Sequence, residues 1–190
     1  MNRLTKMVSV LAATGFALGV SGLASANIVA NGSFETGDFT GWTQIGNTGF
    51  TGVECPGAPF AGPGDGNCDA FFGPVGSTGG ITQNLATVAG VRYFIRFDFD
   101  PDGGTPSSFS ATFGGTTLIS VNNPPNTPYQ VLGFTATATG ATTALTFNFR
   151  DDPGFLKLDS VAVAQAPEPG TMALLGIGMA GLWWKRRKAQ

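Results

Sequence analysis

Residues 93–100 alternate between large apolar side chains and mostly polar ones, in the order Tyr-Phe-Ile-Arg-Phe-Asp-Phe-Asp. Successive side chains of a β-strand point to opposite faces, so this pattern places the four odd-numbered residues on one apolar face. Residues 145–150 repeat the pattern, and residues 108–113, 116–121 and 129–137 also read as strands. Turns rich in Gly, Asn and Pro separate these segments, without a helical period between them. The sequence therefore predicts an all-β fold, a β-sandwich.

Charge divides the 190 residues into three segments. Residues 27–166 contain four basic and eleven acidic residues, a net charge of −7, whereas the other six basic residues lie near the two ends of the chain. Such an acidic segment lacks the basic surface that binds nucleic acid. At about 140 residues it is long enough to form one domain with a buried core.

Residues 1–26 have the parts of a secretory signal peptide. Arg3 and Lys6 form a basic start, an apolar stretch continues to Leu23, and the small residues Ala24-Ser25-Ala26 follow. This order predicts export, with cleavage by signal peptidase before residue 27. An amphipathic or buried N-terminal helix is the alternative.

The C-terminal segment, residues 167–190, combines a stiff start, an apolar stretch and a basic end. Residues 171–184 would form a helix of about 21 Å, short against a hydrocarbon core of about 30 Å. Pro167 and Pro169 keep Glu168 extended. We therefore expect a short transmembrane helix that a cytoplasmic cluster of cations stops in the membrane. That cluster is Lys185, Arg186, Arg187 and Lys188.

This order of Pro167-Glu168-Pro169, apolar helix and basic end resembles the PEP-CTERM sorting signal. The resemblance covers residues 167–190. It implies recognition by an exosortase, a membrane cysteine protease of Gram-negative bacteria that make extracellular polysaccharide. It further implies that the helix is in the membrane transiently and that the processed protein reaches the cell surface or the medium. An ordinary C-terminal membrane anchor is the alternative.

The two ends of the middle segment resemble the first and last strands of galactose-binding-like jelly rolls, the sandwich of many carbohydrate-binding modules. Residues 31–43 read NGSFETGDFTGWT and residues 158–163 read LDSVAV, with Ser160 where that family has a second acid. The resemblance implies a jelly roll in which a structural Ca²⁺ is held by Glu35, Asp159 and main-chain oxygens.

The residues themselves give a second reason to consider Asp159. If Val161 and Val163 face the core, strand alternation turns Asp159 inward as well, and a buried carboxylate needs a compensating partner. The alternative is an Asp that meets water at a frayed strand end or a bulge.

Cys55 and Cys68 are the only cysteines in the sequence. An exported protein meets an oxidising compartment, so we expect them to form a disulfide that closes a loop of fourteen residues. A reactive cysteine nucleophile is the alternative, but it usually needs a histidine, and the sequence has none.

Three acids are spaced as at the start of an EF-hand, in the order Asp98-x-Asp100-x-Asp102-Gly103. The twelfth position of that loop would be Phe109 rather than the bidentate Glu that calcium binding requires. We therefore expect a solvated acidic turn after a strand.

Three classes of function remain open. The first is a non-catalytic surface or matrix protein that binds extracellular polysaccharide weakly, the second a specific carbohydrate-binding module, and the third a polysaccharide hydrolase. The lack of histidine excludes a Ser-His-Asp triad, and no spacing marks a glycosidase carboxylate pair, so we expect no enzyme. Candidate glycan contacts are Trp42, Arg96, Tyr129 and Arg150, which offer aromatic faces and polar groups.

Overall fold

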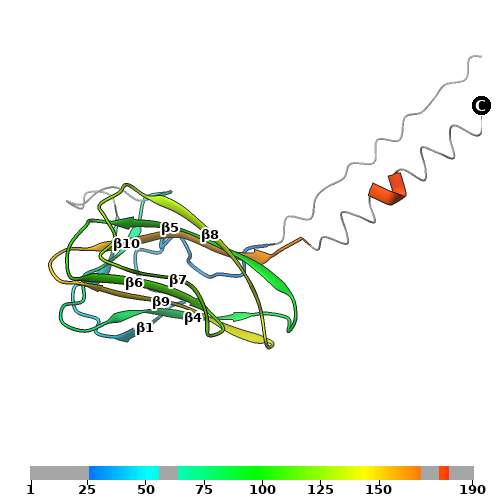
Figure 1. The fold of residues 1–190 in the computed structure, drawn as a ribbon, viewed down its shortest axis with the longest axis horizontal. Coiled ribbons are helices and arrows are strands. Elements are labelled where there is room, and N and C mark those ends of the chain that lie inside the picture. Colours follow the sequence, from blue (N-terminus) through cyan, green and yellow to red (C-terminus); the bar gives the residue numbers. More distant parts are fainter. Residues whose placement is uncertain (1–25, 56–63, 168–175, 180–190) are drawn as a thin grey trace, which may run out of the picture.

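A computed structural model describes residues 26–55, 64–167 and 176–179. Within these ranges, ten strands form two five-stranded antiparallel sheets that lie face to face (Figure 1). The first sheet has the order β1 (Thr43–Gly46), β4 (Gly79–Ala86), β9 (Thr142–Asp151), β6 (Ser107–Phe113) and β7 (Thr116–Asn122). The second has the order β2 (Thr51–Glu54), β3 (Asp69–Phe72), β10 (Leu156–Gln165), β5 (Arg92–Pro101) and β8 (Gln130–Thr137). The predicted β-sandwich is confirmed.

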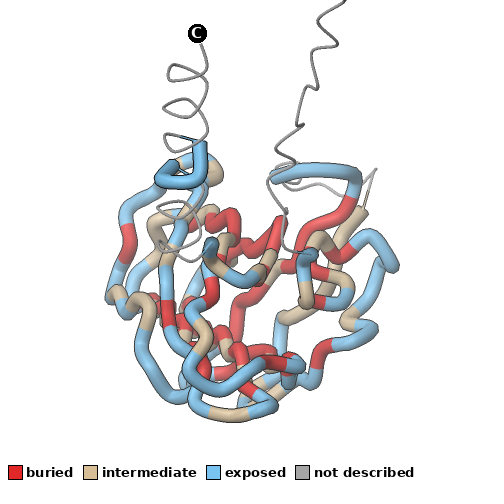
Figure 2. Tube along the Cα trace, turned by 90° about the vertical axis from the view of Figure 1, so that its right-hand side faces the viewer, coloured by how far each residue is buried: buried red, intermediate tan, exposed pale blue. Residues whose placement is uncertain are grey.

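Aromatic rings from both sheets fill the space between them. The predicted apolar face of β5 is buried, as are the inward residues of β9. The Phe97 and Phe147 rings meet edge to face with centroids 5.0 Å apart, and the Phe72 and Phe149 rings stack at 3.8 Å. Figure 2 shows buried segments within the sandwich and exposed segments around it. Packing of large side chains from alternate strand positions therefore holds the two sheets together.

The opening segment departs from the expected strand. Residues 31–42 form turns rather than a strand, and the first strand starts at Thr43. The segment nevertheless lies beside the closing strand, as the resemblance implies, because the Val161 N–H donates to the Gly32 carbonyl at 2.9 Å. A Cβ at residue 32 would lie 2.0 Å from the Val161 oxygen. Only glycine permits this close approach.

A β-bulge in β10 changes the predicted orientation of Asp159. The register against β5 shifts between Asp159 and Ala162, and Ser160 has a φ of 53°. As a result, Leu158 and Val161 both pack in the core although they are three positions apart, an odd spacing. The predicted burial of Asp159 is confirmed, but its predicted orientation toward the core is wrong, because the bulge interrupts the two-residue period.

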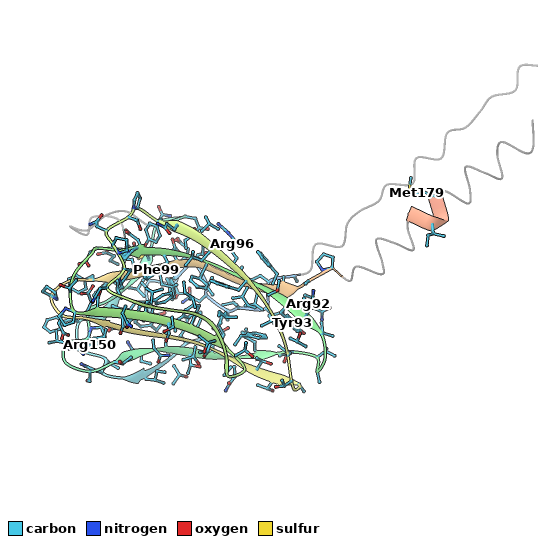
Figure 3. All side chains as sticks on the ribbon, in the orientation of Figure 1. Arg92, Tyr93, Arg96, Phe99, Arg150 and Met179 are labelled. Atoms are coloured by element: carbon cyan, nitrogen blue, oxygen red, sulfur yellow. A yellow bond between two sulfur atoms is a disulfide. The ribbon has the colours of Figure 1, made fainter. Side chains whose placement is uncertain are left out.

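The chain enters and leaves the sandwich domain at the same side. The Ile28 N–H donates to the Val163 carbonyl at 2.9 Å, and the Ala166 N–H donates to the Arg92 carbonyl at 2.9 Å. Figure 3 shows Arg92 and Tyr93 at this side and Arg150 at the opposite end of the sandwich. The loops beyond the end of β5 therefore lie at the far side from the chain ends.

The predicted terminal helices lie largely outside the described residues. Residues 1–25 of the signal peptide, Glu168, Pro169 and the basic cluster at 185–188 are not among them. Of the expected helix at 171–184, the structure describes residues 176–179, which are helical. Within the described part of the chain, no helix has the length and apolar character needed to cross a bilayer.

Candidate functional site

A pocket of about 490 Å³ lies where β5 ends and where β8 and β10 begin. Because β5 is antiparallel to both neighbours, the end of β5 and the starts of the other two strands meet at one edge of the sheet. The pocket is lined by Asp100, Asp102, Asn126, Thr127, Pro128, Phe155 and Lys157. Six of these seven side chains are polar or aromatic.

The pocket continues a row of charged side chains on the outer face of the second sheet. Phe97 and Phe99 of β5 face the core, so alternation turns Asp98 and Asp100 outward. Asp100 lies opposite Lys157 of β10, and Asp98 lies opposite Asp159. The predicted solvated turn is therefore wrong for these two acids, since both belong to β5 and Asp98 is 5% exposed.

A buried ionic network fixes the wall of the pocket at Lys157. Its ammonium group forms ion pairs with Glu54 and, at 3.1 Å, with Asp69. The Tyr129 hydroxyl donates to the same Asp69 carboxylate at 2.8 Å. Burial raises the pKa of Glu54, while its ion pair with Lys157 opposes that rise. Burial, followed by the negative charge of Asp69, also raises the pKa of Tyr129. The Asp69 carboxylate is therefore held by both the Lys157 ammonium group and the Tyr129 hydroxyl.

Asp102 ties the loops on the other side of the pocket together. Its carboxylate accepts the Phe155 N–H at 2.9 Å and the Gly104 N–H at 2.7 Å, and its carbonyl accepts the Asn126 side-chain amide at 2.8 Å. The Phe155 ring meets the Phe71 ring edge to face, with centroids 5.5 Å apart. These contacts position one aromatic ring and one amide beside the acidic residues.

The lining has the chemistry of a site for a neutral, hydroxyl-rich molecule. Asp100 and Asp102 can accept hydrogen bonds, Asn126 can both donate and accept, and the Phe155 ring offers an apolar face. The Asp100 side chain is half-buried, and this burial raises its pKa. Convergent polar groups beside an apolar surface are typical of small-ligand pockets.

The two predicted calcium ligands accept main-chain hydrogen bonds instead of facing an open site. Glu35 accepts the Asn67 and Cys68 N–H groups at 2.7 and 2.9 Å, and these bonds lower its pKa. Asp159 accepts the Asp65 and Ser160 N–H groups at 2.8 and 2.6 Å. In the described residues, no three His, Cys, Asp or Glu side chains gather as a metal site. Calcium at Glu35 and Asp159 stays a prediction.

Asp159 is fully buried although it lies on the outer face of the sheet. The loop that covers it includes Gly64, where a Cβ would lie 3.2 Å from oxygens of both Asp159 and Asp98. Burial raises the Asp159 pKa to about 7, and the two main-chain N–H groups oppose that rise. The predicted disulfide, Cys55–Cys68, is present and closes this loop.

The four predicted glycan contacts do not form one site. Trp42 is 7% exposed and stacks against Phe34 in the core, which leaves no ring face for a sugar. Arg96 pairs with Asp98 at 3.2 Å on the outer face of β5, whereas Arg150 pairs with Asp152 at 2.5 Å on the other sheet. Tyr129 is beside the pocket through its bond to Asp69.

Sequence analysis missed Phe155 and Asn126, which line the pocket from two loops. Each follows a turn rich in Pro, Gly, Asn or Asp, at residues 151–154 and 122–125. Such turns mark loops at the end of a sandwich, where binding residues concentrate. The turns were visible in the sequence, but their meeting at one edge depends on the strand order.

Residues 165–188 match a family model described as the PEP-CTERM protein-sorting motif. The match includes the tripeptide, the apolar stretch and the basic cluster, so the sequence carries this sorting motif. The motif indicates export and exosortase-mediated sorting to the cell surface of a Gram-negative bacterium. A search of the curated proteins found no match to this sequence.

Several solved structures share the fold. TmCBM61, solved with beta-1,4-galactotriose, has a TM-score of 0.62 at 18% identity, over 75% of this chain and 100% of that one. The CBM22-1 xylan-binding domain from Paenibacillus barcinonensis Xyn10C has a TM-score of 0.53 at 14% identity. That match covers 76% of this chain and 97% of the other chain. The Clostridium thermocellum CBM22-1–GH10 modules, solved with xylohexaose, have a TM-score of 0.54 at 14% identity. That match covers 75% of this chain and 29% of the other chain. The domain thus has the jelly-roll sandwich of carbohydrate-binding modules, some of which are attached to glycoside hydrolases.

Proposed function

We propose that this protein is a non-catalytic surface protein that binds neutral extracellular polysaccharide through the pocket at Phe155. The observation that carries the proposal is the pocket itself, which combines an aromatic ring with hydrogen-bonding groups on a carbohydrate-binding-module fold. A sugar ring presents C–H groups on its face and hydroxyls at its edge. The Phe155 ring would pack on that face, while Asp100, Asp102 and Asn126 would bond the hydroxyls.

The position of the pocket fits a protein that is held or released at its C-terminal side. Residues 28 and 166 lie at one side of the sandwich, and the pocket lies at the other. A domain attached through residue 166 would thus present the pocket away from the attachment point. Exosortase processing after Pro167 would leave the pocket unchanged.

The charge of the lining favours a neutral sugar over an acidic one. Asp100 and Asp102 are part of the lining, and the Lys157 charge is already offset by Glu54 and Asp69. A uronate would bring a further negative charge close to the Asp100 and Asp102 carboxylates, which would repel it. We therefore propose neutral hexose or pentose polymers as the ligand class.

Catalysis is not part of the proposal. Glycoside hydrolysis needs two carboxyl groups on opposite sides of the scissile bond, one acting as an acid and the other as a base or nucleophile. Asp102 instead accepts a main-chain N–H group at each carboxylate oxygen, which fixes it between two loops and leaves its remaining lone pairs to accept sugar hydroxyls. We expect bound polysaccharide to be recovered without new reducing ends.

The test is a glycan array followed by titration of the best ligand. The variant Phe155→Ala removes the stacking face, and Phe94→Ala is the matched control because Phe94 is an exposed aromatic on the same strand as Asp100. We expect binding of neutral glycans, at least tenfold weaker in Phe155→Ala and unchanged in Phe94→Ala. Binding that survives Phe155→Ala, or that prefers uronates, would contradict the proposal.

A further inference from the structure

The carboxylate of Asp151 is buried without compensation. It continues the inward alternation of Leu145, Phe147 and Phe149 along β9, and its residue exposure is 0%. Neither carboxylate oxygen makes a hydrogen bond to any described residue. A charged carboxylate in this position is costly unless a counter-charge joins it.

Asp102 and Asp151 face a common space that glycines keep open. A Cβ at residue 104 would lie 2.6 Å from an Asp151 oxygen and 3.1 Å from an Asp102 oxygen. A Cβ at residue 154 would lie 1.6 Å from the second Asp102 oxygen. Side chains at these two positions would collide with the carboxylates, so glycine at both positions lets the two acids pack against the backbone and face each other.

The nearby basic group does not neutralise this pair. Arg150 lies next to Asp151 in the sequence, but alternation places its side chain on the opposite face of β9. There the guanidinium pairs with Asp152, whose second oxygen accepts the Gly76 N–H. The like charges of Asp102 and Asp151 therefore remain together at the end of the sandwich.

We propose that Asp102 and Asp151 bind a calcium ion between the loops that follow β5 and β9. The Asp151 oxygens, together with the lone pairs of the Asp102 oxygens that do not accept the Gly104 and Phe155 N–H groups, supply hard oxygen ligands. Ca²⁺ accepts six to eight ligands, so main-chain carbonyls and water would complete the shell. Mg²⁺ fits less well, because it requires a strict octahedron and releases its water reluctantly. The ion would neutralise the buried charge of Asp151.

This site is separate from Glu35 and Asp159. Those two residues accept main-chain N–H groups of the disulfide loop, whereas neither Asp151 oxygen has a partner at hydrogen-bond distance among the described residues. The ion would join the loops at 101–106 and 151–155, which also include the pocket residues Asp102 and Phe155. The calcium proposal itself does not depend on sugar binding.

The test is calcium titration of the purified protein after chelator treatment, by calorimetry and by thermal unfolding. We expect Ca²⁺ alone to bind and to raise the melting temperature. Asp151→Asn should lose one bound ion per chain and most of the rise, with at least thirtyfold weaker binding at this site. Asp159→Asn is the matched control and should keep both effects at the Asp102–Asp151 site.

The outcomes separate the two candidate sites. Calcium binding that persists in full in Asp151→Asn, or that disappears only in Asp159→Asn, would overturn the proposal, as would a wild-type protein that does not respond to calcium. If Asp151→Asn does not fold, Asp102→Asn provides the second variant, since Asp102 is exposed. Loss of one ion in that variant supports the site, and an unchanged titration refutes it.

Discussion

Replacing Lys157 by Met tests the buried ionic network beside the pocket. The Lys157 side chain is 7% exposed, and its partners Glu54 and Asp69 are 10% and 1% exposed. Met has a similar length and no charge, so the variant leaves two buried carboxylates without their cation. Loss of one partner of a buried ion pair costs about 3–5 kcal/mol of unfolding free energy. We expect a loss in that range at pH 7.5.

The loss should depend on pH. Burial already raises the Glu54 pKa in the wild-type protein, and removal of Lys157 takes away the interaction that opposes that rise. A carboxyl group that is protonated needs no counter-charge, so the loss should be smaller at pH 5 than at pH 7.5. Urea unfolding at both pH values measures this difference.

The matched control is Arg150→Met, which breaks an ion pair whose side chains are 35% and 18% exposed. Exposed pairs contribute about 0–1 kcal/mol, so this variant should be nearly as stable as the wild type. A Lys157→Met variant that loses less than about 1 kcal/mol, or no more than the control, would refute the reasoning.

Three further predictions concern the core, the buried acid and the tail. Gly32→Ala should cost at least about 1–3 kcal/mol in urea unfolding, because its Cβ would meet the Val161 oxygen, and Gly140→Ala, with ordinary contacts, should cost little. The Asp159 pKa is about 7, above its unfolded value, so the folded state keeps a proton that the unfolded state loses. With a chelator present, the free energy of unfolding should therefore fall as pH rises from about 4 to about 7. This fall should be smaller in Asp159→Asn. The intact mass of the exported protein should show truncation near Pro169 only in cells with exosortase, whereas a full-length C-terminus in both strains would contradict exosortase processing.

The strands of the sandwich were predictable because each carries its own signal. The apolar face of residues 93–100, for example, follows from local alternation and needs no knowledge of the partner strands. The disulfide was predictable for a similar reason, since the sequence offers one pair of cysteines. Local patterns of this kind fix which side chains are buried in a regular strand.

Irregular backbone and strand order account for the parts that were missed. The bulge at Ser160 adds a residue to β10 without a Gly or Pro to mark it, so the orientation of Asp159 could not be read from alternation. The pocket joins Phe155, Asn126 and Asp100 from separate parts of the sequence. Their meeting depends on the pairing of β5 with β8 and β10, which no local pattern encodes.

The most direct test of the central claim is to locate the bound sugar. We would titrate the isotope-labelled protein with the best neutral oligosaccharide from the array and follow the amide resonances. Resonances of Asp102, Asn126 and Phe155 should shift at the lowest ligand ratios, while those of Phe94 and Arg96 in the first half of β5 stay unchanged. Shifts confined to Phe94 and Arg96, or to the outer face of the first sheet, would contradict a sugar site at the Phe155 pocket.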